Sequence, residues 1–345
     1  MSPRIRFAAA AVLIAVLIYA LASRQPNANE SFGYKPDPVG AEQYNKTLPS
    51  PSFALAAPDA MERVVPANTF LWRQMDAAHR ARYNGLPFRC SSQKIGSCVA
   101  HGAAHACFCS EAVAWAAGER DEPPLLSNQA AIYGGSRVEA AGKSGMGDQP
   151  VGGYSDGSTG YRAAKFLREW GVVYKMPYPS ADCTESTPEM EKEYGAYGCG
   201  GKSDGGKLDL EAKKTPCLYV AQVKNYDELV AAISSGHPVT LASSQGFSRT
   251  LDKDSFARAQ GVWMHQMCCI GIRVDIEGAA IINSWGDYLT YTAPTRFPAD
   301  LPDGVFWCDK ATMQRILGQG DCWAISEVQF KYRDISHNNW MEARK

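Results

Sequence analysis

The sequence predicts an α+β fold with helices first and strands second. Proline-poor, Ala-rich stretches such as Cys98 to about Gly118 favour helices in the first half. After Pro238 the pattern changes to short apolar runs rich in β-branched residues, which are typical of strands. Segregation of helices from strands along the chain indicates an α+β fold of two lobes. With 345 residues and 45% apolar side chains, the chain is long enough to bury a sizeable core.

The first 65 residues carry targeting and linker features. Arg4 and Arg6 precede an apolar run, 7–22, that ends in a small-x-small sequence. This pattern is typical of a secretory signal peptide and is shorter than the ~20 residues of a spanning helix, with an uncleaved membrane anchor as the alternative. Residues 23–65 are rich in Pro, Ser, Ala and Asn and predict a flexible linker or pro-segment. We therefore expect a secreted or periplasmic protein, with residues 1–22 either removed or kept as an anchor.

Charge and cysteine content narrow the class of protein further. A formal net charge of −1 gives no electrostatic case for binding nucleic acid. Eleven cysteines suit an oxidising compartment, and ten remain to pair if one is catalytic. The candidates for disulfide bonds, with connectivity left open, are Cys183, Cys199, Cys217, Cys308 and Cys322.

The helical lobe is expected at about residues 90–220 of a domain spanning 66–345. Residues 66–97 approach it, and 71–82 are expected to be helical. After the Cys98 helix, Ser127 is expected to cap a short helix. A glycine-rich loop, 135–160, then leads into a helix over 161–170. Residues 180–217 are expected to form a long loop, which in a compact domain is functional or stapled.

The β lobe is expected at about residues 221–335. Asn225 and Glu228 have the spacing of a capping box before a helix that Gly236 ends. Asp309 is expected to cap a short helix over 311–317. The expected strands are 239–243, 262–274, 279–285, 305–308 and 322–330.

Three residues in the order Cys98, His265 and Asn283 indicate a nucleophile, a base and an orienting group. Cys98 opens its helix, where the positive end of the helix dipole favours thiolate. A cysteine nucleophile needs a base, and the base needs a group that orients it. His265 lies in one predicted strand and Asn283 ends the next, so an antiparallel pair would bring their side chains together.

At these residues the chain resembles the papain-like cysteine peptidases, over roughly residues 93–307. The most specific match is Asn283-Ser284-Trp285-Gly286. The other matching segments are Gly96-Ser97-Cys98, Leu126-Ser127-Asn128-Gln129, Gly152-Gly153-Tyr154, Tyr178-Pro179 and Pro238-Val239. The resemblance implies a papain-like two-lobe fold, with a helical N-terminal lobe and an antiparallel sheet or barrel in the C-terminal lobe.

The resemblance also implies a role for each matching residue. Cys98 would be the nucleophile, His265 the general acid and base, and Asn283 the orienting residue. Gln93 would complete the oxyanion hole from one position nearer to Cys98 than the family places it, where Ser92 stands. The residues implied in binding substrate are Gly152 and Gly153 for its backbone, Trp285 as a shield for the histidine, and Ala242, Met264 and Gln266 near a side-chain pocket.

A metal site is the alternative use of the Cys98 helix. His101, His105 and Cys109 share one helical face with Cys98, and thiol and imidazole are zinc ligands. Ligands along one helix cannot readily close a tetrahedron, so no metal and no cofactor is expected, and the histidines are expected to pack beneath the site. The Lys and Glu residues of 186–214 are expected to be a solvated loop.

The sequence therefore predicts an exported cysteine peptidase that hydrolyses polypeptides through a Cys98 thioester. Two alternatives stay open. Val99 stands where the family has Trp, and Gln93 is out of register, which favours a catalytically impaired fold used as a binding or structural module. A third reading is a related cysteine amidase or transpeptidase acting on cell-wall amides.

Overall fold

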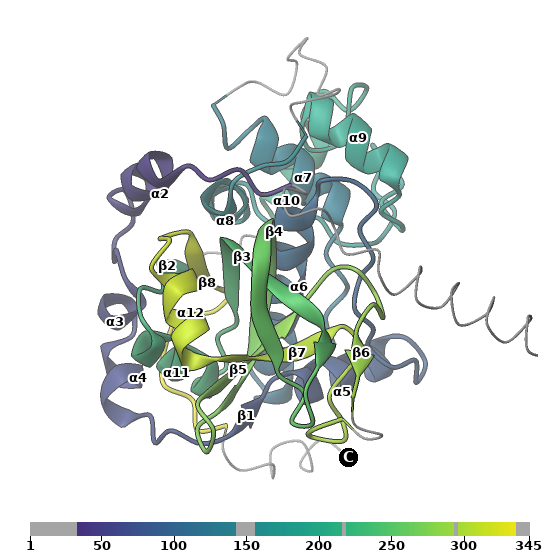
Figure 1. Ribbon diagram of the computed structural model, residues 1–345. Helices are drawn as coiled ribbons and strands as arrows, with labels where there is room; N and C mark the ends of the chain where they lie inside the picture. Colours follow the sequence, from purple (N-terminus) through teal and green to yellow (C-terminus); the bar gives the residue numbers. More distant parts are fainter. Residues whose placement is uncertain (1–32, 143–155, 216–218, 293–295, 336–345) are drawn as a thin grey trace, which may run out of the picture. The chain divides into compact units, whose positions relative to one another are not determined.

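The described part of the chain confirms the predicted α+β fold (Figure 1). In the computed structural model, the described residues are 33–142, 156–215, 219–292 and 296–335, all within the compact unit Ser31–Lys345. Met1–Glu30 is a separate unit, so the predicted signal peptide or anchor lies outside the described residues. Within the described ranges, every helix is too short or too polar to cross a bilayer.

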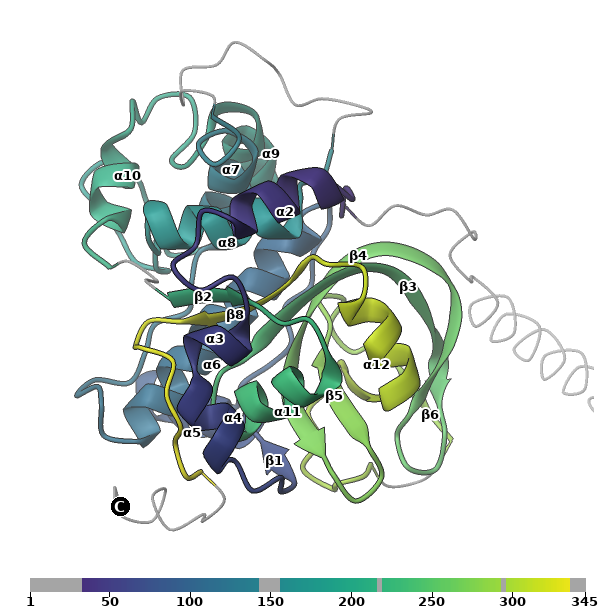
Figure 2. The same cartoon turned by 90° about the vertical axis from the view of Figure 1, so that its left-hand side faces the viewer.

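Residues 33–65 are folded onto the domain, which corrects the prediction of a flexible linker over this part of 23–65. They form α2 (Pro38–Asn45), α3 (Phe53–Ala56) and α4 (Pro58–Arg63). Asp37 and Ser52 cap the first two helices with their side chains. Buried aromatic residues such as Phe53 anchor the segment, and Figure 2 shows α2 beside α8 and α4 beside α11. Because the segment is rich in Pro and Ala, its composition did not indicate these helix caps and buried aromatic residues.

The first lobe is helical, as predicted, but the long loop predicted over residues 180–217 contains two helices. Within residues 180–217, Thr187 caps a helix through its side chain, and Pro188 takes the first helical position. The short helix near residue 129 is capped by Asn128 rather than by Ser127. The helices are α5 (Trp72–Arg82), α6 (Cys98–Ala116), α7 (Gln129–Arg137), α8 (Gly160–Glu169), α9 (Pro188–Tyr197) and α10 (Lys207–Ala212).

The second lobe contains one mainly antiparallel sheet in the order β2-β8-β3-β4-β5-β7, with β1 paired to β4 and β6 to β3. The paired strands β3 and β4 extend beyond the predicted residue 243 and begin before the predicted residue 262. Partly exposed polar residues continue their pairing outside the core. Predicted helices appear as α11 (Tyr226–Ser234) and α12 (Lys310–Leu317). The strands are β1 (Thr69–Phe70), β2 (Tyr219–Gln222), β3 (Val239–Leu251), β4 (Ala257–Arg273), β5 (Gly278–Ile282), β6 (Thr290–Tyr291), β7 (Val305–Asp309) and β8 (Cys322–Ser326).

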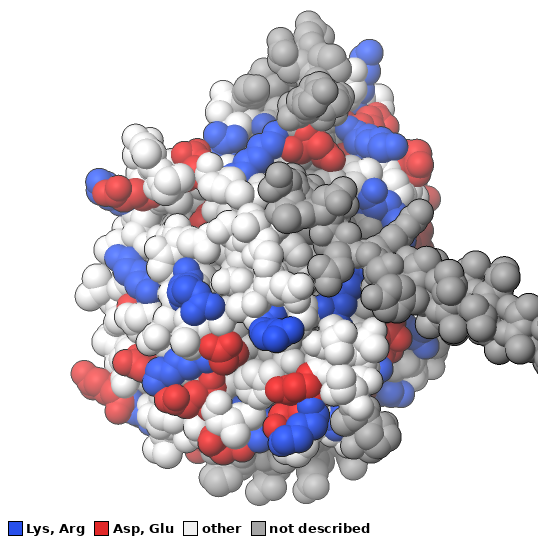
Figure 3. Space-filling model, in the orientation of Figure 1, with Lys and Arg blue, Asp and Glu red and all other residues white. Residues whose placement is uncertain are grey.

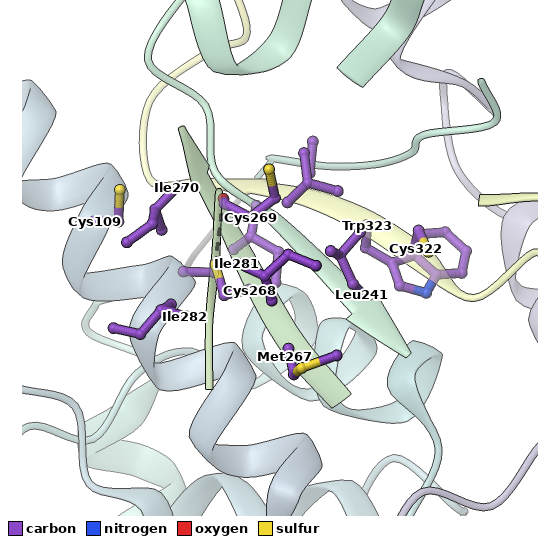
Figure 4. Close-up of a cluster of buried hydrophobic side chains, with 14 of the residues drawn as sticks. Cys109, Leu241, Met267, Cys268, Cys269, Ile270, Ile281, Ile282, Cys322 and Trp323 are labelled. Atoms are coloured by element: carbon purple, nitrogen blue, oxygen red, sulfur yellow. Dashed lines mark hydrogen bonds between the residues drawn. The ribbon is translucent and has the colours of Figure 1, made fainter. Parts of the chain in front are cut away.

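Helix α6 is the buried axis on which the sheet rests. Every residue of α6 except Trp115 is buried, and the helix packs against β4, β8 and β3. Figure 4 shows Cys109 of α6 beside the apolar side chains of β4 and β5, including Ile270 and Ile282. Small residues let the strand approach closely: a Cβ on Gly102 would stand 3.0 Å from the Gln266 side chain. The start of α6 is thereby held against β4.

The surface agrees with the near-zero net charge. Figure 3 shows Lys and Arg interspersed with Asp and Glu on the face in view. That nucleic acid is not a partner stays a prediction.

The predicted capping role of Asn225 at the start of α11 can be tested by mutation. Asn225 accepts a hydrogen bond from the Glu228 backbone N–H at 2.9 Å, and Glu228 reaches back to the Lys224 N–H. We expect Asn225→Ala to lower the free energy of unfolding by about 1 kcal/mol, since one helix N–H loses its acceptor. Urea unfolding measures this, with the exposed Lys224→Ala as the control. Equal stability of both variants would contradict the capping role.

Candidate active site

Cys98 begins α6 and is fully buried. Burial raises the pKa of its thiol to about 12, while the backbone N–H groups of Gln266, Val99 and Cys98 itself act in the opposite direction. The Val99 and Cys98 N–H groups can face the sulfur because backbone N–H groups at a helix N-terminus have no partner within the helix, and the Gln266 N–H comes from strand β4. The site is thus equipped to hold a thiolate, and burial keeps the thiol neutral.

Gln266 joins the first turn of α6 to strand β4. Its side-chain amide donates to the Val99 carbonyl oxygen at 2.9 Å, and its backbone N–H faces the Cys98 sulfur. The preceding residue in β4 is His265. The contact therefore brings the predicted nucleophile and the predicted base to one place, although they are far apart in sequence.

His265 is held by Asn283 and covered by Trp285. Its Nε2 lies 2.7 Å from the Asn283 Oδ1, and its ring stacks on Trp285 with centroids 4.5 Å apart. An amide oxygen only accepts, so Nε2 carries the hydrogen and Nδ1 is the basic nitrogen. Burial lowers the pKa of His265 to about 3, the hydrogen bond that His265 donates to Asn283 raises it, and the nearby His101 lowers it. The imidazole is neutral in this state.

Asn283 is itself fixed at two further points. Its side-chain amide donates to the Tyr288 hydroxyl at 2.7 Å, and its Oδ1 accepts from the Ser284 N–H. The β4–β5 register, with Cys268 opposite Ile282, brings the end of β5 beside His265. Tyr288 is a site residue that sequence reasoning missed, since a tyrosine five residues after Asn283 carries no recognisable signal.

Gln93 lies beside the segment that contains Asn283, but its side chain is occupied. Its backbone N–H donates to the Ser284 carbonyl at 2.8 Å, and its Oε1 accepts from the Ser284 hydroxyl. Its side-chain Nε2 donates to the Ile95 carbonyl at 3.1 Å. Ser92 pairs with Trp285 in an isolated bridge. The role of Gln93 in an oxyanion hole stays a prediction.

Four of the six residues predicted to bind substrate are described, and they lie close to His265 in the fold. Gly152 and Gly153 lie outside the described residues. Ala242 is buried in β3 opposite Gln266, and Met264 is half-buried in β4. The Gln266 side chain faces α6 through its bond to Val99, so it serves the joint between helix and strand.

Residues 33–35, the N-terminal strap, lie between Ser158 and Met264. The Tyr34 N–H donates to the Met264 carbonyl at 3.0 Å. On the other side, the Lys35 N–H donates to the Ser158 carbonyl, and the Ser158 N–H donates to the Gly33 carbonyl, both at 2.8 Å. The strap therefore runs as an extended strand alongside the residue that precedes His265. The sequence offered no signal for Ser158 or for this pairing.

The strap also touches the turn that leads into Cys98. Gly33 has φ +111°, and a Cβ there would stand 2.0 Å from the Gly96 carbonyl oxygen. The Gly96 N–H donates to the Asp156 carboxylate at 2.8 Å. The strap thus contacts Gly96 and Met264, and neither Cys98 nor His265 has any exposed surface. This is a closed state of the site.

A buried carboxylate from α9 holds the residues on either side of Cys98. Glu191 accepts from the Ser97 hydroxyl at 2.7 Å and lies 3.1 Å from His101 Nε2. The other ring nitrogen of His101 lies 2.8 Å from the Ser91 hydroxyl. Glu191 is 3% exposed, so the prediction of a solvated loop over 186–214 is wrong at this residue.

The histidines of α6 take part in this network rather than in a metal site. His105 Nε2 lies 3.1 Å from the same Ser91 hydroxyl that His101 contacts. Among the described residues, no group of three or more His, Cys, Asp and Glu side chains could hold a metal ion. The ten described cysteines, four of the five disulfide candidates included, are free thiols; Cys217 lies outside the described residues.

Comparison with solved structures finds papain-like cysteine proteases. Xylellain from Xylella fastidiosa is 19% identical with a TM-score of 0.48, covering 78% of this chain and 88% of its own. A digestive procathepsin L 3 from Tenebrio molitor is 14% identical with a TM-score of 0.46, covering 77% and 72%. The bromelain protease from Ananas comosus is 14% identical with a TM-score of 0.42, covering 76% and 99%. Searches of family models and of curated proteins find no match.

The Glu191 network yields a stability prediction. Glu191→Ala would leave the buried Ser97 hydroxyl and the His101 ring without their carboxylate, so we expect a loss of about 1–3 kcal/mol in the free energy of unfolding. Glu189→Ala, on the same helix but exposed, is the matched control and should change little. Urea unfolding of both variants measures the difference, and a Glu191→Ala protein as stable as the control would refute the network.

The closed state yields a prediction about pH. With the pKa of Cys98 raised to about 12 and that of His265 lowered to about 3, neither group ionises between pH 5 and 8. We expect iodoacetamide to alkylate Cys98 of the full chain at least about tenfold more slowly than free cysteine at pH 8. Mass spectrometry of each cysteine measures this, with urea-unfolded protein as the control. Rapid labelling at pH 5 would show that the site is open in solution.

Proposed function

We propose that the chain is a cysteine peptidase with Cys98 as nucleophile, His265 as acid and base, and Asn283 as the residue that orients His265. The observation that carries this proposal is the bond from His265 to Asn283 under Trp285, in a strand whose next residue touches Cys98. These contacts support the proposed roles, because covalent catalysis needs a nucleophile, a base and a group that orients the base close together.

The reaction begins when the site opens and water reaches the pair. Solvation removes the burial that holds both groups neutral, so the thiol proton can pass to His265 Nδ1. The thiolate attacks the peptide carbonyl, and the oxyanion takes the Cys98 backbone N–H and, after its amide leaves the Ile95 carbonyl, Gln93. His265 returns the proton to the leaving amine. It then takes a proton from water as the water oxygen attacks the thioester carbonyl. It gives that proton to the Cys98 sulfur as the C–S bond breaks and the carboxylic acid product leaves.

The strap supports polypeptide as the substrate class. Main-chain bonds to Ser158 on one side and to Met264 on the other hold an extended backbone in place. Such bonds are made to any extended peptide, because they use groups that every residue carries. A substrate in the same groove would lie next to Cys98 once the strap has left.

Export is a separate part of the proposal. It is supported by the two arginines and the apolar run 7–22 in the sequence. We propose that the enzyme acts outside the cytoplasm, in the periplasm or beyond the cell, with residues 7–22 removed or retained as an anchor.

A second candidate is a binding module that keeps the fold without catalysis. The buried, neutral Cys98 of the closed state favours it, because a thiol without exposed surface cannot attack a substrate. The two candidates differ in what Cys98 and His265 contribute once the site is open.

Catalysis is tested with Cys98→Ala, His265→Ala and Asn283→Ala in a chain that carries Gly33→Ala to displace the strap. We expect kcat/KM on denatured casein to fall by about 10³-fold or more for the first two, since each removes a bond-making group. Asn283→Ala should lose less, about 10- to 100-fold, because His265 loses only its orientation.

Cys109→Ala is the matched control, a buried cysteine of the same helix. Hydrolysis by the Cys98→Ala protein at the rate of this control would eliminate the peptidase proposal. Absence of hydrolysis in all variants, together with slow alkylation of Cys98 in the opened chain, would favour the binding module.

A further inference from the structure

We propose that the space filled by the Tyr34 side chain is the specificity pocket of the peptide groove, that it takes the tyrosine side chain of a peptide, and that Asp321 is its specificity-determining residue. The inference deepens the proposed function and rests on the groove assigned there. Tyr34 acts as an occupant supplied by the chain itself.

The Tyr34 side chain is part of the buried core, but its backbone is held as that of a bound peptide would be. Its own N–H is bound by the Met264 carbonyl, and Ser158 binds the residues on both sides of it. Both partners are main-chain groups of Ser158 and β4, so the same bonds are available to another peptide. The position of Tyr34 is therefore set by pairing that does not depend on its side chain.

The Tyr34 side chain is buried to 3% exposure and bonds to the Asp321 carboxylate. Asp321 is also held by groups other than Tyr34: it accepts from the Gly160 N–H at 2.9 Å and from the Trp323 indole N–H at 2.6 Å. These donors come from α8 and β8, which belong to the body of the fold. Asp321 is thus a preformed acceptor at the end of the space that Tyr34 occupies.

Small residues allow Asp321 to stand at this position. A Cβ on Gly160 would be 2.8 Å from the Asp321 carboxyl group and 2.8 Å from the Ala242 side chain. The sequence prediction that Ala242 lies near a side-chain pocket fits this arrangement. Any larger residue at 160 would push the carboxylate or the strand away.

The chemistry of the pocket favours a phenol over a plain ring. Burial raises the pKa of Asp321 to about 6, so it is mainly ionised at pH 7.5, and the hydroxyl of Tyr34 is among its donors. A phenylalanine in this place would leave the buried carboxylate with one donor fewer. Hydrogen bonds to charged groups predict a preference for Tyr over Phe of about 10- to 100-fold. Phosphotyrosine should be rejected, since its negative charge would face the carboxylate.

The first experiment displaces the strap and measures iodoacetamide alkylation of Cys98 in the full chain. Gly33→Ala introduces the clash with Gly96, and we expect alkylation to accelerate at least about tenfold. Gly85→Ala is the matched control, since it also has positive φ but no atom within 4 Å of the added Cβ.

Tyr34→Phe removes only the hydroxyl and should accelerate alkylation as well, whereas Tyr219→Phe, in β2, should not. Unchanged alkylation in both Gly33→Ala and Tyr34→Phe would overturn the assignment, because the strap would not then cover the thiol.

The second experiment measures protection of Cys98 in the Gly33→Ala chain by the peptide acetyl-Gly-Tyr-Lys-Pro-amide, which has the sequence of residues 33–36. We expect it to slow alkylation at concentrations about 10- to 100-fold lower than the same peptide with Phe in place of Tyr. The phosphotyrosine peptide should not protect. The same peptide with Lys in place of Tyr distinguishes a pocket that binds a phenol from a pocket that binds any cation.

Asp321→Asn keeps the shape of the side chain and removes its charge, so the Tyr-over-Phe preference should shrink to a few-fold. Equal protection by the Tyr and Phe peptides, stronger protection by the Lys peptide, or an undiminished preference in Asp321→Asn would overturn the proposal. Since protection is read on the thiol without turnover, these outcomes are independent of whether casein is hydrolysed, so this proposal and the peptidase proposal can fail separately.

Discussion

The joint between strand β4 and the first turn of α6 is the contact on which the site depends. Gln266 bonds to Val99 with its side chain and faces the Cys98 sulfur with its backbone N–H. His265 is its neighbour in the strand, so this one joint brings the proposed base into the neighbourhood of the proposed nucleophile. The small residues of α6, Gly102 among them, permit the close approach. Asn283 and Trp285 then fix the imidazole from the next strand.

Burial decides the state of these groups. The same desolvation raises the pKa of Cys98 and lowers that of His265, so the closed site holds a neutral thiol beside a neutral imidazole. An ion pair can form only when water returns. The strap is consequently more than a cover. Under the proposed function, departure of the strap would change both the access of substrate to the pair and the charge of the pair.

Hydrogen bonds to two carboxylates hold the turn that leads into Cys98. Gly96 donates to Asp156, and Ser97 donates to Glu191 of α9, so the residues before Cys98 are held by two carboxylates. Glu191 also lies against His101, one turn into α6. Helix α9 lies in a stretch that reads as a polar loop, yet one of its side chains is buried beneath the site.

The sequence by itself determined the α+β class, the central helix from Cys98 and the capping box at Asn225, because local periodicity and capping residues indicate them. It also determined the candidates Cys98, His265 and Asn283, because each lies in a short motif or a recognisable local pattern. Only the tertiary structure decided that residues 33–65 fold onto the domain, that Glu191 is buried, that Tyr288 holds Asn283, and that Tyr34 meets Asp321. These are contacts between residues far apart in the chain. Their side chains are ordinary surface or turn types, and their role follows from what packs against them, which no local pattern records.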